Sequence, residues 1–119
     1  MTTERMKMKK YRDWPSFPAY LSDCRRAAQG DTLVTPPVAA AILGYSKVSI
    51  RRILEQEDIH SWAWYEAGQF HPSEVFVAVS SLVRFGLKKG RLGEYEDEAP
   101  LRAVFGRDDY ERLRRSAPA

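Results

Sequence analysis

The sequence predicts a mainly helical fold with one small β-hairpin, and three local patterns lead to this prediction. Apolar residues recur at three- and four-residue spacing in several segments, as they do on one face of a helix. Two of these segments are separated by a tight turn at Gly44. The aromatic-rich segment from His60 to Pro72 contains the reversal Ala67-Gly68, which is typical of two short strands joined by a turn.

Length and composition favour one compact domain outside the membrane. The chain has 119 residues and is 44% hydrophobic, which is enough for a core and argues against a wholly disordered chain. Apolar runs such as Val75–Val79 are far too short to cross a bilayer, and Met1–Lys10 is charged and lacks the apolar part of a signal peptide. The single cysteine, Cys24, cannot form an internal disulfide. We therefore expect a soluble, cytoplasmic protein.

The chain divides into three predicted parts. Residues 1–15 form a basic and mobile N-terminal arm, residues 16–86 the main domain with a leading helix, and residues 87–119 a C-terminal extension. The leading helix covers Phe17–Ala28, with Ser16 placed to cap it and Gly30 to end it. The extension carries a last short helix at about Asp108–Arg115.

The centre of the main domain is predicted to form two helices joined by a turn. Thr35 is placed to cap the first helix, and Pro36 stands at its first position, where a missing N–H has no cost. Gly44 accepts the positive φ that the turn requires. Ser46 then caps the second helix, residues 47–56.

The second helix has two distinct faces when its residues are placed at 100° intervals. Ile50, Ile53 and Leu54 fall on one side and are predicted to be core. The opposite side carries Lys47, Val48, Arg51, Arg52 and Glu55.

A hairpin and a third helix follow. With Ala67-Gly68 as a two-residue turn, His71 is expected opposite Trp64. Pro72-Ser73-Glu74 is expected to open a helix that continues to about Phe85. The run Val75–Val79 is also β-prone, so a strand is the alternative there.

The segment Thr35–Leu54, with Ile59, the hairpin and the helix behind it, resembles the MerR-like and excisionase-like winged helix-turn-helix proteins. The resemblance covers about a third of the chain. It implies that the second helix enters the DNA major groove and that the hairpin, the wing, reaches the backbone or minor groove beside it. It also implies a sequence-specific protein that binds double-stranded DNA, either a transcriptional regulator or an accessory factor of a phage or mobile element.

Carried over by position, the candidates for DNA contact in the second helix are Ser46, Lys47, Ser49, Arg51 and Arg52. Their chemistry agrees, because Arg presents a fork to guanine edges or phosphate, Lys a point charge, and the serines short hydroxyls near a helix N-terminus. The alternative is a solvated face whose two arginines pair with Glu55, Glu57 or Asp58.

The wing departs from the family pattern. Its predicted tip, Tyr65-Glu66-Ala67-Gly68-Gln69, has an acidic residue and no basic one, so the expected phosphate contacts are missing. Either the wing is structural, or the N-terminal arm supplies the charge. The arm candidates are Arg5, Lys7, Lys9 and Lys10.

The aromatic residues of the hairpin allow a second function. Trp62 and Trp64 share a strand face with His60, and this face is expected either to pack against the second or third helix or to bind a partner chain. The second function is therefore a protein-interaction module, with Trp62, Trp64 and Tyr65 as candidate partner-binding residues and the acidic run Glu94–Glu98 as support.

Catalysis is not indicated by any motif. No glycine-rich phosphate loop, paired nucleophile and base, or zinc-ligand spacing is present, so we expect no enzyme activity, cofactor or metal. Cys24 falls on the predicted buried face of its helix. Because one helix reads only a few base pairs, useful specificity requires a second copy, and a homodimer is expected.

Overall fold

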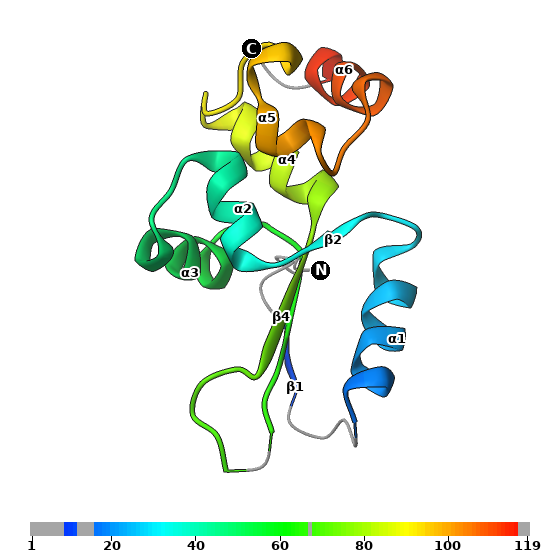
Figure 1. Ribbon diagram of the computed structural model, residues 1–119, viewed down its shortest axis with the longest axis vertical. Helices are drawn as coiled ribbons and strands as arrows, with labels where there is room; N and C mark the ends of the chain where they lie inside the picture. The colour runs from blue at the N-terminus through cyan, green and yellow to red at the C-terminus, as the bar shows by residue number, and fades with distance from the viewer. Residues whose placement is uncertain (1–8, 12–15, 67, 117–119) are drawn as a thin grey trace, which may run out of the picture.

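The computed structural model describes residues 9–11, 16–66 and 68–116, which form a mainly helical fold with a small sheet (Figure 1). The helices and strands in chain order are β1 (Lys9–Tyr11), α1 (Phe17–Ala28), β2 (Leu33–Val34), α2 (Pro36–Leu43), α3 (Lys47–Gln56), β3 (Ser61–Trp64), β4 (Glu74–Ala78), α4 (Val79–Lys88), α5 (Ala99–Arg102) and α6 (Arg107–Ser116). A 3-10 turn, Tyr95–Asp97, lies between α4 and α5.

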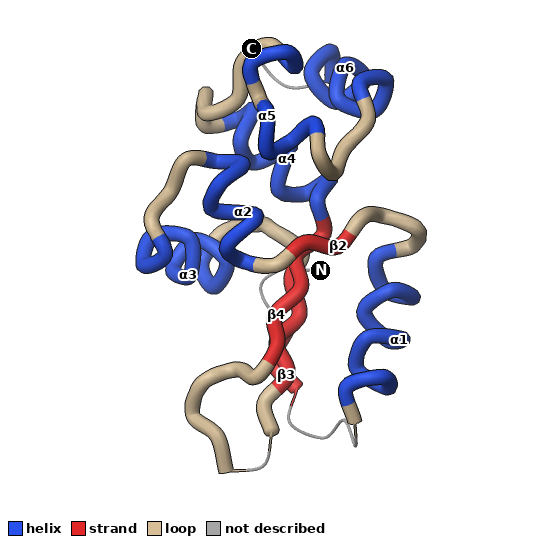
Figure 2. Tube along the Cα trace, in the orientation of Figure 1, coloured by secondary structure: helices blue, strands red, loops and turns tan. Residues whose placement is uncertain are grey.

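The sheet has the strand order β1-β3-β4-β2 and forms the narrow centre of the fold (Figure 2). β4 pairs antiparallel with both β3 and β2, whereas β1 runs parallel to β3. The sequence interpretation placed β1 within a mobile arm, which is wrong for Lys9–Tyr11 because their backbone joins the sheet edge. The side chains of these three residues, and the rest of residues 1–15, lie outside the described part of the structure.

Two apolar clusters pack on the two faces of the sheet. α2 and α3 lie on one side of the β3–β4 hairpin and α1 lies on the other (Figure 1). The main core joins α2, α3 and α4 with α5 and α6. The smaller cluster contains Tyr20 and Cys24 of α1 with Trp62 and Ala78 of the sheet. The Tyr20 hydroxyl donates to the Trp62 carbonyl at 2.6 Å, which fixes α1 to the sheet.

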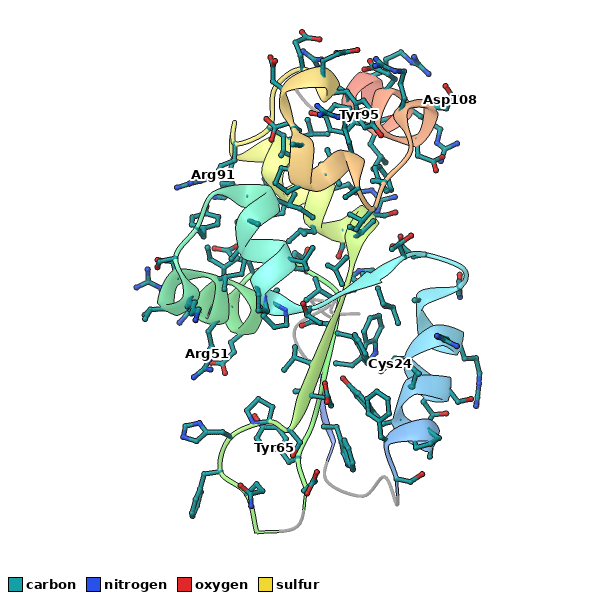
Figure 3. All side chains as sticks on the ribbon, viewed as in Figure 1. Cys24, Arg51, Tyr65, Arg91, Tyr95 and Asp108 are labelled. Atoms are coloured by element: carbon teal, nitrogen blue, oxygen red, sulfur yellow. The ribbon has the colours of Figure 1, made fainter. Side chains whose placement is uncertain are left out.

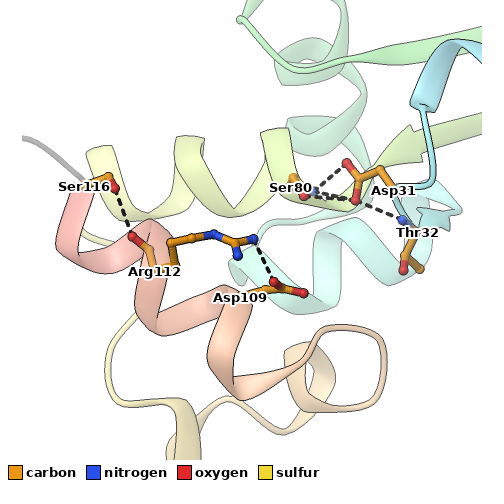
Figure 4. Close-up of polar contacts among 6 residues, drawn as sticks. All are labelled: Asp31, Thr32, Ser80, Asp109, Arg112 and Ser116. Carbon is orange, nitrogen blue, oxygen red and sulfur yellow. Dashed lines mark hydrogen bonds and ion pairs between the residues drawn. The ribbon is translucent and has the colours of Figure 1, made fainter.

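The third predicted helix begins later than expected. Residues Glu74–Ala78 form β4, and α4 starts at Val79, so the strand alternative is confirmed and the helix start at Pro72-Ser73-Glu74 is wrong. β4 pairs with two strands, so its backbone groups are hydrogen-bonded in the sheet. Val77 packs in the main core on one face, and Phe76 and Ala78 pack in the smaller cluster on the other. The Asp31 carboxylate then caps α4 by accepting from the Ser80 N–H at 3.1 Å (Figure 4).

The hairpin connection is longer than the predicted two-residue turn. Trp64 pairs with Glu74 rather than with His71, so residues 65–73 form a loop. The Ser73 N–H donates to the Trp64 carbonyl at 2.7 Å and closes the base of this loop. Ala67 lies outside the described residues, and Gly68 has a φ of +80°.

The helices outside the centre agree largely with the sequence. Ser16 caps α1 by accepting from the Ala19 N–H, although the left-handed residue that ends α1 is Gln29, one before the predicted Gly30. The predicted terminal helix is present as α6. α5 was not predicted.

Candidate nucleic-acid interface

The α2–turn–α3 unit is built from the local signals that the sequence contains. Pro36 opens α2, and Gly44 ends it with a φ of +74°. Ser46 caps α3, since its Oγ accepts from the Ser49 N–H at 3.1 Å. Thr35 holds the cap position of α2 without a side-chain hydrogen bond. The two helices therefore begin and end as predicted.

Arg91, from the segment after α4, supports this turn from outside. Its guanidinium donates to the carbonyls of Leu43 and Gly44, each at 3.3 Å, and lies 3.7 Å above the Tyr45 ring. The last carbonyls of a helix have no hydrogen-bond partner inside the helix, and Arg91 supplies one for each of these two. Figure 3 labels Arg91 beside this corner. No local pattern in the sequence indicates this contact, because Arg91 lies 47 residues after Gly44.

The two faces of α3 are divided as predicted. Ile50 and Leu54 are buried and Ile53 is half-buried against the main core. The opposite face is exposed. Figure 3 shows Arg51 on the side of α3 toward the loop of residues 65–73. The exposed residues of this face are Lys47, Val48, Arg51, Arg52 and Glu55.

The cationic side chains of α3 are available for an external partner. Among the described residues, no ion pair includes Lys47, Arg51 or Arg52. In the described residues, Arg51 and Arg52 therefore do not form the ion pairs with Glu55, Glu57 or Asp58 that the alternative interpretation expected. An exposed cation without a partner keeps its full attraction for phosphate.

Ser46 and Ser49 form the N-terminal cap of α3. The Ser46 hydroxyl donates to Ser49 Oγ at 3.1 Å while it accepts the Ser49 N–H. The Ser49 hydroxyl keeps its own proton for a further hydrogen bond, because each serine supplies one donor and two acceptor positions.

A groove of about 550 Å³ separates α3 from the loop of residues 65–73. The α3 side of the groove carries Lys47 and Arg51, and the loop side carries Phe70 and His71. Phe70 is 92% exposed, the largest exposed apolar side chain of this region. The sequence assigned Phe70 to a strand, and no local pattern distinguishes an exposed loop aromatic from one that packs.

The other hairpin aromatics are mostly covered. Trp62 is 4% exposed and Tyr65 is buried, whereas Trp64 is half-buried and stacks on the Tyr20 ring at 5.8 Å. The tryptophan face thus packs against α1, and the expectation that it packs against the second or third helix is wrong. α1 is the only helix on that side of the sheet in the described residues (Figure 1).

The chain matches no protein-family model, no curated protein and no solved structure.

The acidic run Glu94–Glu98 is engaged within the molecule. Glu94 pairs with Arg114 at 3.0 Å, Glu96 pairs with Arg107, and the Glu98 carboxylate accepts from the Gly93 N–H. The hydrogen bond from Arg114 lowers the pKa of Glu94. These contacts join the segment after α4 to α6.

The remaining polar candidates are dispersed. Burial raises the pKa of the Cys24 thiol to about 11, so this thiol is a poor nucleophile near neutral pH. Within the described residues, no group of three or more His, Cys, Asp and Glu side chains is arranged to hold a metal ion. No helix in this part of the chain combines the length and apolar character needed to cross a membrane.

Of the predicted DNA-binding residues of the N-terminal arm, Arg5 and Lys7 lie outside the described residues, as do the side chains of Lys9 and Lys10.

Proposed function

We propose that this chain is a winged helix-turn-helix protein that binds double-stranded DNA sequence-specifically, as a regulator of transcription or an accessory factor of a phage or mobile element. In this proposal α3 enters the major groove and the loop of residues 65–73 acts as the wing. The order α2, turn, α3, β-hairpin, α4 supports the arrangement. The observation that carries it is the exposed face of α3, whose cations have no ion-pair partner among the described residues.

The groove between α3 and the wing suits a sugar–phosphate strand. Lys47 and Arg51 border one side next to Glu55, and His71 borders the other next to Glu74, so a strand in the groove lies between a major-groove helix and a minor-groove loop and meets cations from α3. Arg51 and Arg52 are the principal base or phosphate contacts, with Lys47 as a phosphate anchor. Ser49 offers its hydroxyl beside them.

Duplex-DNA binding across salt concentrations tests the proposal. We expect the logarithm of affinity to fall linearly with the logarithm of salt, with a slope of about −0.9 for each phosphate contact. Arg51→Ala combined with Arg52→Ala should abolish binding. Binding that survives this double substitution would contradict the assignment of α3.

The chain offers a matched control for the double substitution. Arg25 and Arg26 are adjacent exposed arginines on α1, on the far side of the sheet from α3. Arg25→Ala with Arg26→Ala removes the same charge and should leave most of the affinity. Equal loss in both double variants would mean that total charge, and not α3, determines binding.

A protein-interaction module is the second candidate, favoured by Phe70. A 92% exposed phenylalanine beside a groove that also contains Pro36 and Pro72 is an apolar contact point for another chain. The salt experiment separates the two candidates, because a chain that binds only proteins shows no salt-dependent affinity for duplex DNA. A homodimer remains part of the DNA proposal, and two copies on one selected duplex are the expected stoichiometry.

A further inference from the structure

Val48 is the one apolar side chain on the exposed face of α3 in the described structure. It is 81% exposed, and it belongs to neither apolar cluster. Its side chain therefore contributes little to the fold. Arg51 and Arg52 stand three and four residues later, so they are its neighbours on the helix surface.

The position of Val48 is that of a base-reading residue. It is the second residue of α3, and the N-terminal residues of a recognition helix are those that reach base edges in the major groove. A β-branched side chain has a restricted χ1, so its two methyl groups are held in place before any contact forms. The adjacent cations bring the polyanion to this surface, but the methyl groups themselves have no polar interaction to offer.

Only one major-groove feature of normal DNA is apolar, and it is the 5-methyl group of thymine. Resting on the proposed function, we propose that Val48 determines part of the sequence specificity by packing against this methyl group. The bound site would then contain a required thymine next to the bases or phosphates contacted by Arg51 and Arg52. Ala and Thr methyl groups make the same type of contact in other complexes.

The test removes each side of the contact separately: the thymine methyl group in the DNA and the Val48 methyl groups in the protein. A duplex is first enriched from a random library with the wild-type protein, and each thymine is then replaced in turn by deoxyuridine, which lacks only the 5-methyl group. We expect that one thymine in each half-site is sensitive. Its replacement alone should weaken wild-type binding by about three- to fivefold, which corresponds to the free energy of burying one methyl group. Val48→Ala should bind the unmodified duplex more weakly and respond less to the same replacement, because alanine keeps only one, shorter methyl group.

Two controls keep the result specific. Val48→Ala should melt at or slightly above the wild-type temperature, because the side chain is exposed and alanine is the better helix former. Gln56→Ala, at an exposed position near the other end of α3, should retain the wild-type response to deoxyuridine.

The outcomes separate this inference from the proposed function. An enriched duplex whose deoxyuridine replacements are all neutral would overturn the role of Val48 and leave DNA binding intact. The same deoxyuridine response in Val48→Ala and wild type would also overturn it. If no duplex is enriched and none is bound, the proposed function fails, and the inference fails with it.

Discussion

Tyr20 and Cys24 lie one turn apart on the buried face of α1, where burial controls their ionisation. Both are fully buried in the cluster beneath α1. Burial raises the pKa of the Cys24 thiol to about 11 and raises the pKa of Tyr20 as well. Both groups are therefore neutral in the folded protein at neutral pH, and charging either one opposes folding.

Cys24 gives a prediction for alkaline pH. Burial raises its folded pKa to about 11 from an ordinary value of 9.0, so its contribution to stability is complete below pH 9.0 and is lost as pH rises towards 11. We expect the free energy of unfolding to fall between pH 7 and pH 10, by about 1–2 kcal/mol from the thiol alone. Urea unfolding of wild type and Cys24→Ala at both pH values measures this difference, since Tyr20 is common to both proteins. An equal loss in the two proteins would show that the thiol does not contribute.

At the level of elements, the α2–turn–α3 corner depends on a residue distant in sequence. Arg91 supplies hydrogen bonds to Leu43 and Gly44 and covers the Tyr45 ring. Gly86 allows α4 to approach α2 closely, because an added Cβ would lie 2.6 Å from Leu43 and 2.8 Å from Leu92. The position of α3 is therefore determined by α4 and the segment after it as well as by the turn.

We predict that Arg91→Ala loosens this corner. The loss of two hydrogen bonds and one cation–π contact at an exposed site should cost about 1–2 kcal/mol in the free energy of unfolding. Amide hydrogen exchange at Gly44 and Tyr45 should accelerate more than exchange in α6. Arg84→Ala, which removes an exposed arginine of α4, is the control and should change neither quantity. Unchanged exchange in Arg91→Ala would contradict the supporting role.

The same corner shows which elements a sequence can specify. Gly44 and Ser46 act through neighbouring backbone groups, so the bounds of α2 and α3 were predictable, as was the exposure of Lys47, Arg51 and Arg52 from helical periodicity. The start of α4 was not, because a β-branched run becomes a strand only when partner strands lie beside it. The hairpin register depends on the pairing of Trp64 with Glu74 and not on the glycine at residue 68. The exposure of Phe70 follows from that register.

At the level of the whole molecule, the C-terminal segment is part of the main core. α5 packs on α2 and α6 packs on α4. Tyr110 is fully buried, its ring lies 5.6 Å from that of Tyr95, and its hydroxyl donates to the Gly93 carbonyl at 2.5 Å. Residues 93–116 therefore stabilise the helices that present α3, although α3 itself is formed from local signals.

This arrangement predicts that a core change in α6 destabilises the whole fold. Tyr110→Ala should cost about 3–5 kcal/mol, as expected for truncation of a buried aromatic side chain, whereas Tyr110→Phe should lose only the hydroxyl contact, about 1 kcal/mol. Far-UV circular dichroism reports on the helices. Tryptophan fluorescence reports on the environment of Trp62 and Trp64, which lie in the cluster beneath α1 on the other face of the sheet. If the two clusters unfold as one unit, both signals shift together in Tyr110→Ala. A fluorescence transition that stays at its wild-type position while the helical signal shifts would show that α1 and the sheet unfold independently of the main core.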